Sequence, residues 1–154
     1  MKMEIQAALD MADETDSFLQ ITDVIFDKER DSGYDDLTVS EKTVFCIDGL
    51  LREMENGGFV QFFHHDVGAL ASETLDSLER IKAKDSWALL NQMIDLFPER
   101  SVPADEDARI DLFDQIQDEH TDKINALDDG FYDLTENLVG LTLAYVAKNL
   151  KDFH

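Results

Sequence analysis

Apolar residues recur every three or four positions along most of the chain, which is the spacing of one face of an α-helix. No segment shows the sustained alternation of apolar and polar residues that indicates a half-buried strand. The pattern therefore predicts an all-α protein without significant sheet. Helices are expected over residues 4–30 (with a break near 12–14), 39–56, 72–82, 85–97, 104–119 and 122–150, with a short one at 59–63.

The segment 39–56 is expected to form the centre of the fold. Thr38 and Glu41 have the spacing of a capping box, so a helix should start near Val39. Apolar residues then cover most of the circumference of this helix, which is typical of a largely buried helix. The expected architecture is a single-domain helical bundle, residues 1–154, packed around this central helix.

A Gly-Gly pair follows the central helix directly. Glycine adopts positive φ at little cost, so the pair is expected to end the helix and redirect the chain. The aromatic residues that follow share a helical face, and we expect them to clamp this corner into the core. The alternative is a small polar site at the corner, lined by Glu53, Asn56 and Gln61. The corner as a whole comprises Glu53, Asn56, Gly57, Gly58, Phe59, Gln61, Phe62 and Phe63.

The charge of the chain is its most unusual property. There are 35 acidic residues against 13 basic ones, which gives a formal net charge of −22. Such a surface repels DNA, RNA and anionic membranes, and it attracts basic partners. Direct binding of nucleic acid or membrane is therefore not expected, and a basic protein, such as a DNA-binding protein, is the expected partner. The sequence is compatible with both a monomer and a homodimer.

Aspartate dominates over glutamate, with 23 Asp and 12 Glu. Glutamate is the better helix former, whereas aspartate competes with the backbone for hydrogen bonds. Something other than helix propensity therefore favours the shorter carboxylate. Two explanations stay open: the surface of a salt-adapted protein, or a surface that holds anionic oxygens at defined positions.

The acidic residues form stripes on two predicted helices. Between Asp105 and Glu136 there are 12 acids against two bases, Arg109 and Lys123. Within 104–119 the aspartates are spaced four, three and four apart, so they stack opposite the apolar face at a repeated cost of a few tenths of a kcal/mol. The candidate partner-binding residues are Asp107, Asp111, Asp114, Asp118 and Asp122, with Asp16, Asp23 and Asp27 as a second stripe on the first helical segment.

No residue pattern predicts catalysis, a metal or a cofactor. The single cysteine, Cys46, cannot form a disulfide within the chain, and the Asp-rich stretches lack EF-hand spacing. His64 and His65 are adjacent, and adjacent side chains on a helix do not face one site. There is no nucleophile elbow or phosphate-binding glycine loop. We therefore expect a protein that is not an enzyme, and the absence of a secretory or membrane-spanning segment predicts a cytoplasmic location.

The corner residues resemble the hallmark of a bacterial family of small all-helical proteins, largely of unknown function: Glu53-x-x-Asn56-Gly57-Gly58-Phe59-x-Gln61-Phe62-Phe63. The family includes a DNA mimic that occupies a transcription factor in place of DNA. His64-His65 departs from the pattern, which has an aromatic residue and an Asn there. The similarity runs from Thr38 to about Leu150 and takes in Val44-Phe45-Cys46-Ile47, Leu96-Phe97-Pro98 and the region of Tyr145. The resemblance implies the fold more firmly than the function, because one fold serves many functions.

Three functional hypotheses follow. The first is a DNA mimic whose acidic helical faces occupy the basic surface of a DNA-binding protein, because duplex DNA is also a rod of closely spaced negative charge. The second is an immunity or antitoxin-like protein that covers a basic toxin. The third is a helical domain with a small-molecule or catalytic site at the Asn56–Gln61 corner, where the acidity is surface adaptation alone.

Overall fold

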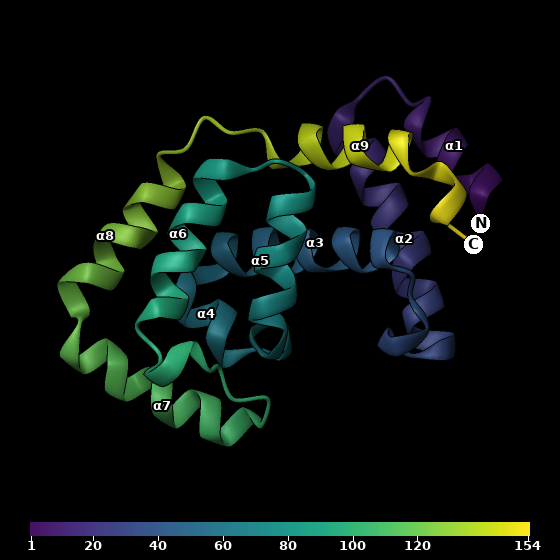
Figure 1. The fold of residues 1–154 in the computed structure, drawn as a ribbon. Helices are drawn as coiled ribbons and strands as arrows, with labels where there is room; N and C mark the ends of the chain where they lie inside the picture. Colours follow the sequence, from purple (N-terminus) through teal and green to yellow (C-terminus); the bar gives the residue numbers. More distant parts are fainter.

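The computed structural model describes residues 1–154, and it contains nine α-helices, four short 3-10 helices and no strand (Figure 1). The all-α prediction is confirmed. None of the helices combines the length and the apolar character that crossing a membrane requires. The helices are α1 (Lys2–Leu9), α2 (Glu14–Ser32), α3 (Val39–Gly57), α4 (Phe59–His64), α5 (Ala71–Arg80), α6 (Lys84–Asp95), α7 (Glu106–Glu119), α8 (Thr121–Tyr132) and α9 (Leu138–Lys148), with 3-10 turns η1 (Tyr34–Asp36), η2 (Asp66–Leu70), η3 (Pro98–Arg100) and η4 (Leu150–Asp152).

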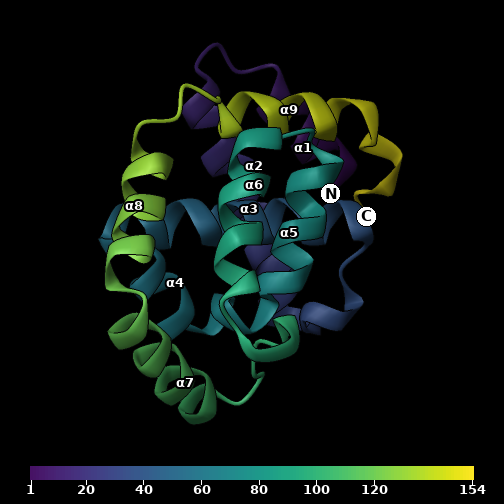
Figure 2. The ribbon, with the colours of Figure 1, turned by 60° about the vertical axis from the view of Figure 1, so that its left-hand side comes forward.

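Helix α3 lies at the centre of the molecule, as predicted, and packs against α2, α4, α5 and α9 (Figures 1 and 2). Its start is set by the predicted capping box. The Thr38 hydroxyl accepts the Glu41 N–H at 3.1 Å, and the Glu41 carboxylate accepts the Thr38 N–H at 2.8 Å. Because both orphan donors are satisfied, the helix begins at Val39.

The core consists of two hydrophobic clusters. The larger one fills the space between α3 and the helices α4 to α8, and the smaller one joins α1 and α2 to the start of α3 and to the C-terminal segment. Helices α2, α3 and α9 contribute to both clusters and so tie them together. Their residues in the larger cluster include Phe18, Ile47 and Leu138, and those in the smaller one include Ile21, Val44 and Val146.

The N-terminal segment breaks where the sequence predicted a break, because α1 ends at Leu9 and α2 starts at Glu14. The cause is Asp13, whose carboxylate accepts the Asp16 N–H at 3.0 Å and caps α2. Helix α2 then extends to Ser32, slightly beyond the expected end at residue 30.

The prediction of one continuous helix over 122–150 is wrong. This segment is divided into α8 and α9 by a connector, residues 133–137. Two polar side chains of the connector explain the division. Asn137 caps α9 by accepting the Gly140 N–H at 2.9 Å. Glu136 leaves the helical path to cap another helix, α6.

Helix α6 is capped by a side chain from outside the helix. The Glu136 carboxylate accepts the N–H groups of Asp85 and Ser86 at 3.0 and 2.9 Å, and the Ser86 hydroxyl at 2.7 Å. Orphan N–H groups at the start of a helix require such acceptors. The connector is therefore held in place by α6.

Candidate functional site

The acidic stripe on α7 is exposed as predicted. Asp107, Asp111, Asp114 and Asp118 are all solvent-exposed. Only Asp114 contacts a basic residue type, since the His64 Nε2 lies 2.8 Å from its carboxylate. The other three aspartates make no ion pair, so most of the negative charge on this face is not neutralised within the molecule.

The one basic residue of α7 points away from this face. Arg109 is 1% exposed, and its guanidinium donates to four backbone carbonyls. These are Phe63 O at 2.8 Å, His65 O at 3.0 Å, Ala104 O at 3.1 Å and Pro103 O at 3.2 Å. Sequence reasoning counted Arg109 among the bases of this region, and no local signal indicates its burial. The exposed face of α7 is consequently more uniformly negative than the sequence suggests.

The corner after α3 depends on Gly58. Its φ is +84°, a left-handed conformation that favours glycine, and a methyl group at this position would lie 2.8 Å from an oxygen of Asp128. Asp128, from α8, accepts the Phe59 N–H at 2.9 Å and so caps α4. Burial raises the pKa of the Asp128 carboxyl, whereas this hydrogen bond opposes the rise.

The aromatic residues of the corner connect it to α7. Phe59, Phe62 and Phe63 are fully buried. Phe63 stacks on Phe113 of α7 with ring centroids 5.3 Å apart and an interplanar angle of 18°. Together with Arg109, this stack fixes α7 against the corner.

The polar residues of the corner do not converge on one cavity. Glu53 is buried, and its carboxylate contacts the Arg52 Nε at 3.4 Å and the His65 Nδ1. Asn56 is exposed, whereas Gln61 is half-buried against Gly57. Neither Asn56 nor Gln61 lines any of the five principal hollows of the molecule.

The aspartates of the second stripe, on α2, are also exposed, and one of the three is paired with an arginine. Asp27 pairs with Arg30. Asp23 contributes to raising the pKa of the neighbouring Asp48, for which burial is the larger cause and which pairs with Arg52 at 2.8 Å. Figures 1 and 2 both place α2 at the opposite end of the molecule from α7, so the two stripes do not form one surface.

The stripe does not continue into Asp122 along one helix. Helix α7 ends at Glu119, and α8 starts at Thr121 in a different direction (Figure 1). Asp122 is exposed in the first turn of α8, followed on that helix and at its end by the exposed Asp129 and Asp133. The exposed carboxylates therefore continue from α7 onto α8, which runs in another direction.

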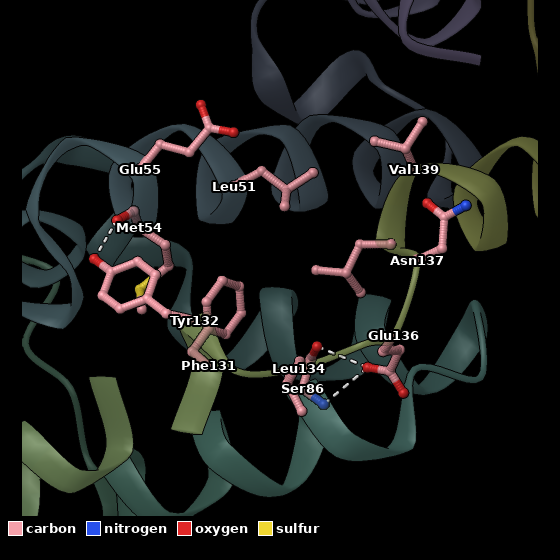
Figure 3. Close-up of a pocket in the computed structure, with 11 residues that line it drawn as sticks. Leu51, Met54, Glu55, Ser86, Phe131, Tyr132, Leu134, Glu136, Asn137 and Val139 are labelled. Atoms are coloured by element: carbon pink, nitrogen blue, oxygen red, sulfur yellow. Dashed lines mark hydrogen bonds between the residues drawn. The ribbon is translucent and has the colours of Figure 1, made fainter. Parts of the chain in front are cut away.

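A hollow of about 300 Å³ lies between the second half of α3 and the α8–α9 connector (Figure 3). Its walls are mainly apolar. The Tyr132 hydroxyl donates to the Met54 carbonyl at 2.5 Å, which joins the end of α8 to α3. The lining residues are Leu51, Met54, Glu55, Ser86, Phe131, Tyr132, Leu134, Glu136, Asn137, Leu138 and Val139.

Comparison with curated proteins finds no match, and comparison with solved structures finds none either. One family model does match, over residues 35–149, which is nearly the span, 38–150, over which the sequence resembles the family of the corner motif. The match includes α3, the corner, α7 and α8. This chain belongs to the family of DMP19-like proteins.

Proposed function

We propose that the protein is a DNA mimic, in which α7 and the start of α8 occupy the basic surface of a DNA-binding protein. The observation that carries the proposal is the arrangement of charge on α7. Six carboxylates of this helix are exposed while its only arginine is buried. Membership in the DMP19-like family fits this interpretation.

The spacing of the charges supports the proposal. Helix α7 rises about 1.5 Å per residue, so its six carboxylates, between Glu106 and Glu119, follow one another at about 4 Å on average along the axis, with single gaps of about 1.5 to 6 Å. Phosphates follow one another at about 3.4 Å along one strand of duplex DNA. Lysine and arginine side chains arranged for phosphates would therefore meet anionic oxygens at a similar density.

The rigidity of α7 supports it as well. The Phe63–Phe113 stack and the four Arg109 hydrogen bonds fasten the helix along its inner face. Aspartate has a short side chain and loses less rotamer freedom than glutamate when it is bound. A partner therefore pays little entropy for ordering these carboxylates.

The test is affinity capture from native cell extract with the tagged protein as bait. Bound proteins are washed at low and then moderate salt and challenged with duplex DNA. We expect a DNA-binding protein to be retained and to be released by DNA, because the two ligands share its basic surface. A partner that DNA does not displace would contradict mimicry and would favour an immunity-like function.

Substitutions then assign the surface. Asp107→Asn, Asp111→Asn and Asp118→Asn together should abolish capture of that protein, and the salt dependence of binding should weaken because fewer charges are engaged. The matched control is Asp16→Asn, Asp23→Asn and Asp27→Asn on α2. Equal loss in both variants would show that net charge matters rather than the α7 surface.

A further inference from the structure

The hollow beside the α8–α9 connector combines apolar walls with an acidic rim. Two glutamates, Glu55 and Glu136, line the hollow, and no lysine or arginine does. In Figure 3, Leu51 and Leu134 border its middle, Phe131 and Tyr132 close one end, and Val139 lies toward the other. Asp133 follows Tyr132 directly and adds a further exposed carboxylate.

Tyr132 presents an aromatic ring to solvent at the rim. The residue is 54% exposed, which is unusual for a large apolar side chain in this molecule. Its hydroxyl is held by the Met54 carbonyl, and its ring packs at 83° on the edge of Phe131, with centroids 6.3 Å apart. A fixed, exposed tyrosine beside an apolar hollow is typical of the energetic centre of a protein interface.

The connector side of the hollow is a built wall rather than a loose loop. Glu136 caps α6 through three hydrogen bonds. Asn137 caps α9 and also donates to Glu14 of α2 at 3.0 Å. A preformed wall keeps the hollow open before a partner arrives and lowers the entropic cost of binding.

We propose that this hollow receives an apolar side chain of the basic partner, from a segment in which arginine or lysine flanks that side chain. The inference rests on the proposed function and deepens it. The exposed carboxylates of Glu55 and of the adjoining Asp133 attract the flanking cations, and the walls bury the apolar group. Tyr132 lies at the end of α8, about 18 Å along that helix from α7, so one partner domain can reach both surfaces.

The hollow supplies a selectivity that the acidic stripe lacks. Charge complementarity mainly accelerates encounter and excludes acidic proteins, and any basic protein satisfies it. Burial of one apolar side chain discriminates between basic proteins by shape, at about tenfold or more for each well-buried group.

The experiment uses two capped pentapeptides as probes, one with a central leucine and one with a central alanine, each flanked by two arginines on either side. Binding to the full chain is measured by calorimetry, and the methyl signals of Leu51, Leu134 and Val139 are followed by NMR. We expect the leucine peptide to bind about tenfold more tightly and to shift these signals. Equal affinities, or unshifted methyl signals, would overturn the proposal.

Variants localise the effect. Leu134→Ser opens the wall without touching the main core, and it should remove the preference for leucine; Tyr132→Ala should do the same. Leu19→Ser is the matched control, because Leu19 is a half-exposed leucine on α2, away from the hollow. Thermal melts establish that each variant is folded. A preference for leucine that survives both Leu134→Ser and Tyr132→Ala in folded protein would overturn the proposal.

The two proposals fail separately. If both peptides bind equally and the α7 Asn substitutions weaken both, the hollow is not a site while the acidic surface remains one. If the leucine preference is present but the α7 substitutions leave partner capture unchanged, the hollow is a binding site and α7 is not the partner surface. The alternative occupant is a second copy of this chain, which sedimentation equilibrium detects. A dimer that dissociates on Leu134→Ser would overturn the proposal, because a second copy would then fill the hollow.

Discussion

Helices α2 and α7 carry aspartates at similar helical spacing, yet they present different surfaces. On α2, Asp27 pairs with the exposed Arg30, while Asp23 lies near the Asp48–Arg52 pair of the neighbouring α3. On α7 the only arginine, Arg109, is buried, and the exposed carboxylates have a single histidine among them. Because Arg109 is buried whereas Arg30 is exposed, α7 presents its carboxylates without an arginine among them and α2 does not.

The contrast also shows how the acidic face is supported. The cation that could neutralise α7 is used to attach the helix, because its guanidinium binds the carbonyls at the end of α4 and before α7. One residue therefore both removes positive charge from the surface and holds the surface rigid.

The largest expected effect comes from removing this arginine. Arg109→Leu removes the guanidinium donor from the buried Phe63 carbonyl and from three partly buried ones, of which the His65 carbonyl still accepts the Gly68 N–H, so we expect the free energy of unfolding to fall by about 3 kcal/mol. Urea denaturation measures it. The counterpart on α2, Arg30→Leu, removes an exposed pair and should change stability by about 0.5 kcal/mol or less. Similar losses in both variants would remove the distinction between the two arginines.

Replacing the glycine that ends α3 should cost more stability than replacing the one that ends α2. Gly58→Ala adds backbone strain and a clash with Asp128, and it should cost about 2–3 kcal/mol. Gly33 has a similar φ of +92° but open space around it, so Gly33→Ala should cost only about 1 kcal/mol. The difference isolates the contact with Asp128, and Asp128→Ala should make Gly58→Ala less costly. A Gly58→Ala cost unchanged by Asp128→Ala would refute the clash.

Neutralising the stripes should stabilise the protein, by a smaller amount. Asp107→Asn, Asp111→Asn and Asp118→Asn relieve repulsion between neighbouring turns, and should add about 1 kcal/mol in low salt, with the gain fading as salt is added. The α2 set gains less, because Asp27→Asn also removes the partner of Arg30. Thermal melts across a salt series measure both. A stable α7 variant that no longer captures the partner would show that the acids serve binding at the expense of folding.

The smallest effect concerns the pKa of Asp48, which burial raises and to which Asp23 adds. Because the folded-state pKa lies above the unfolded one, protonated Asp48 favours folding, and this contribution is lost as the pH rises through the raised pKa. Asp23→Asn should lower the pKa of Asp48 and shift that loss to lower pH, whereas Asp107→Asn, on the distant α7, should not. NMR titration of the Asp48 carboxyl measures both. An equal shift in the Asp48 pKa from the two substitutions would contradict a local effect of the Asp23 charge.

The parts of the fold that sequence reasoning predicted depend on local signals. The capping box of Thr38 and Glu41 spans four residues, and the Gly57-Gly58 corner lies in one short stretch. Contacts between distant residues were not predictable in this way. Arg109 reaches a carbonyl 46 residues away, and Glu136 caps a helix 50 residues away.

The features of the candidate site also fall into those that local sequence signals predict and those that depend on distant contacts. Exposure of the α7 aspartates follows from helical periodicity, and it was predicted. Burial of Arg109, the split between α8 and α9 and the hollow at Tyr132 depend on tertiary contacts that outweigh local pattern. Glu136 in particular resembles a solvated acid in the sequence, and only its position beside α6 shows that it is a cap.

Three helices, α2, α3 and α9, supply residues to both hydrophobic clusters. Neither half of the molecule can therefore open without disturbing the other, and the chain should melt in a single cooperative transition. The slowest-exchanging amides are expected along α3, where exchange requires global unfolding rather than local fraying. The strongly self-repelling surface is thus supported by an interior in which no part unfolds independently of the rest.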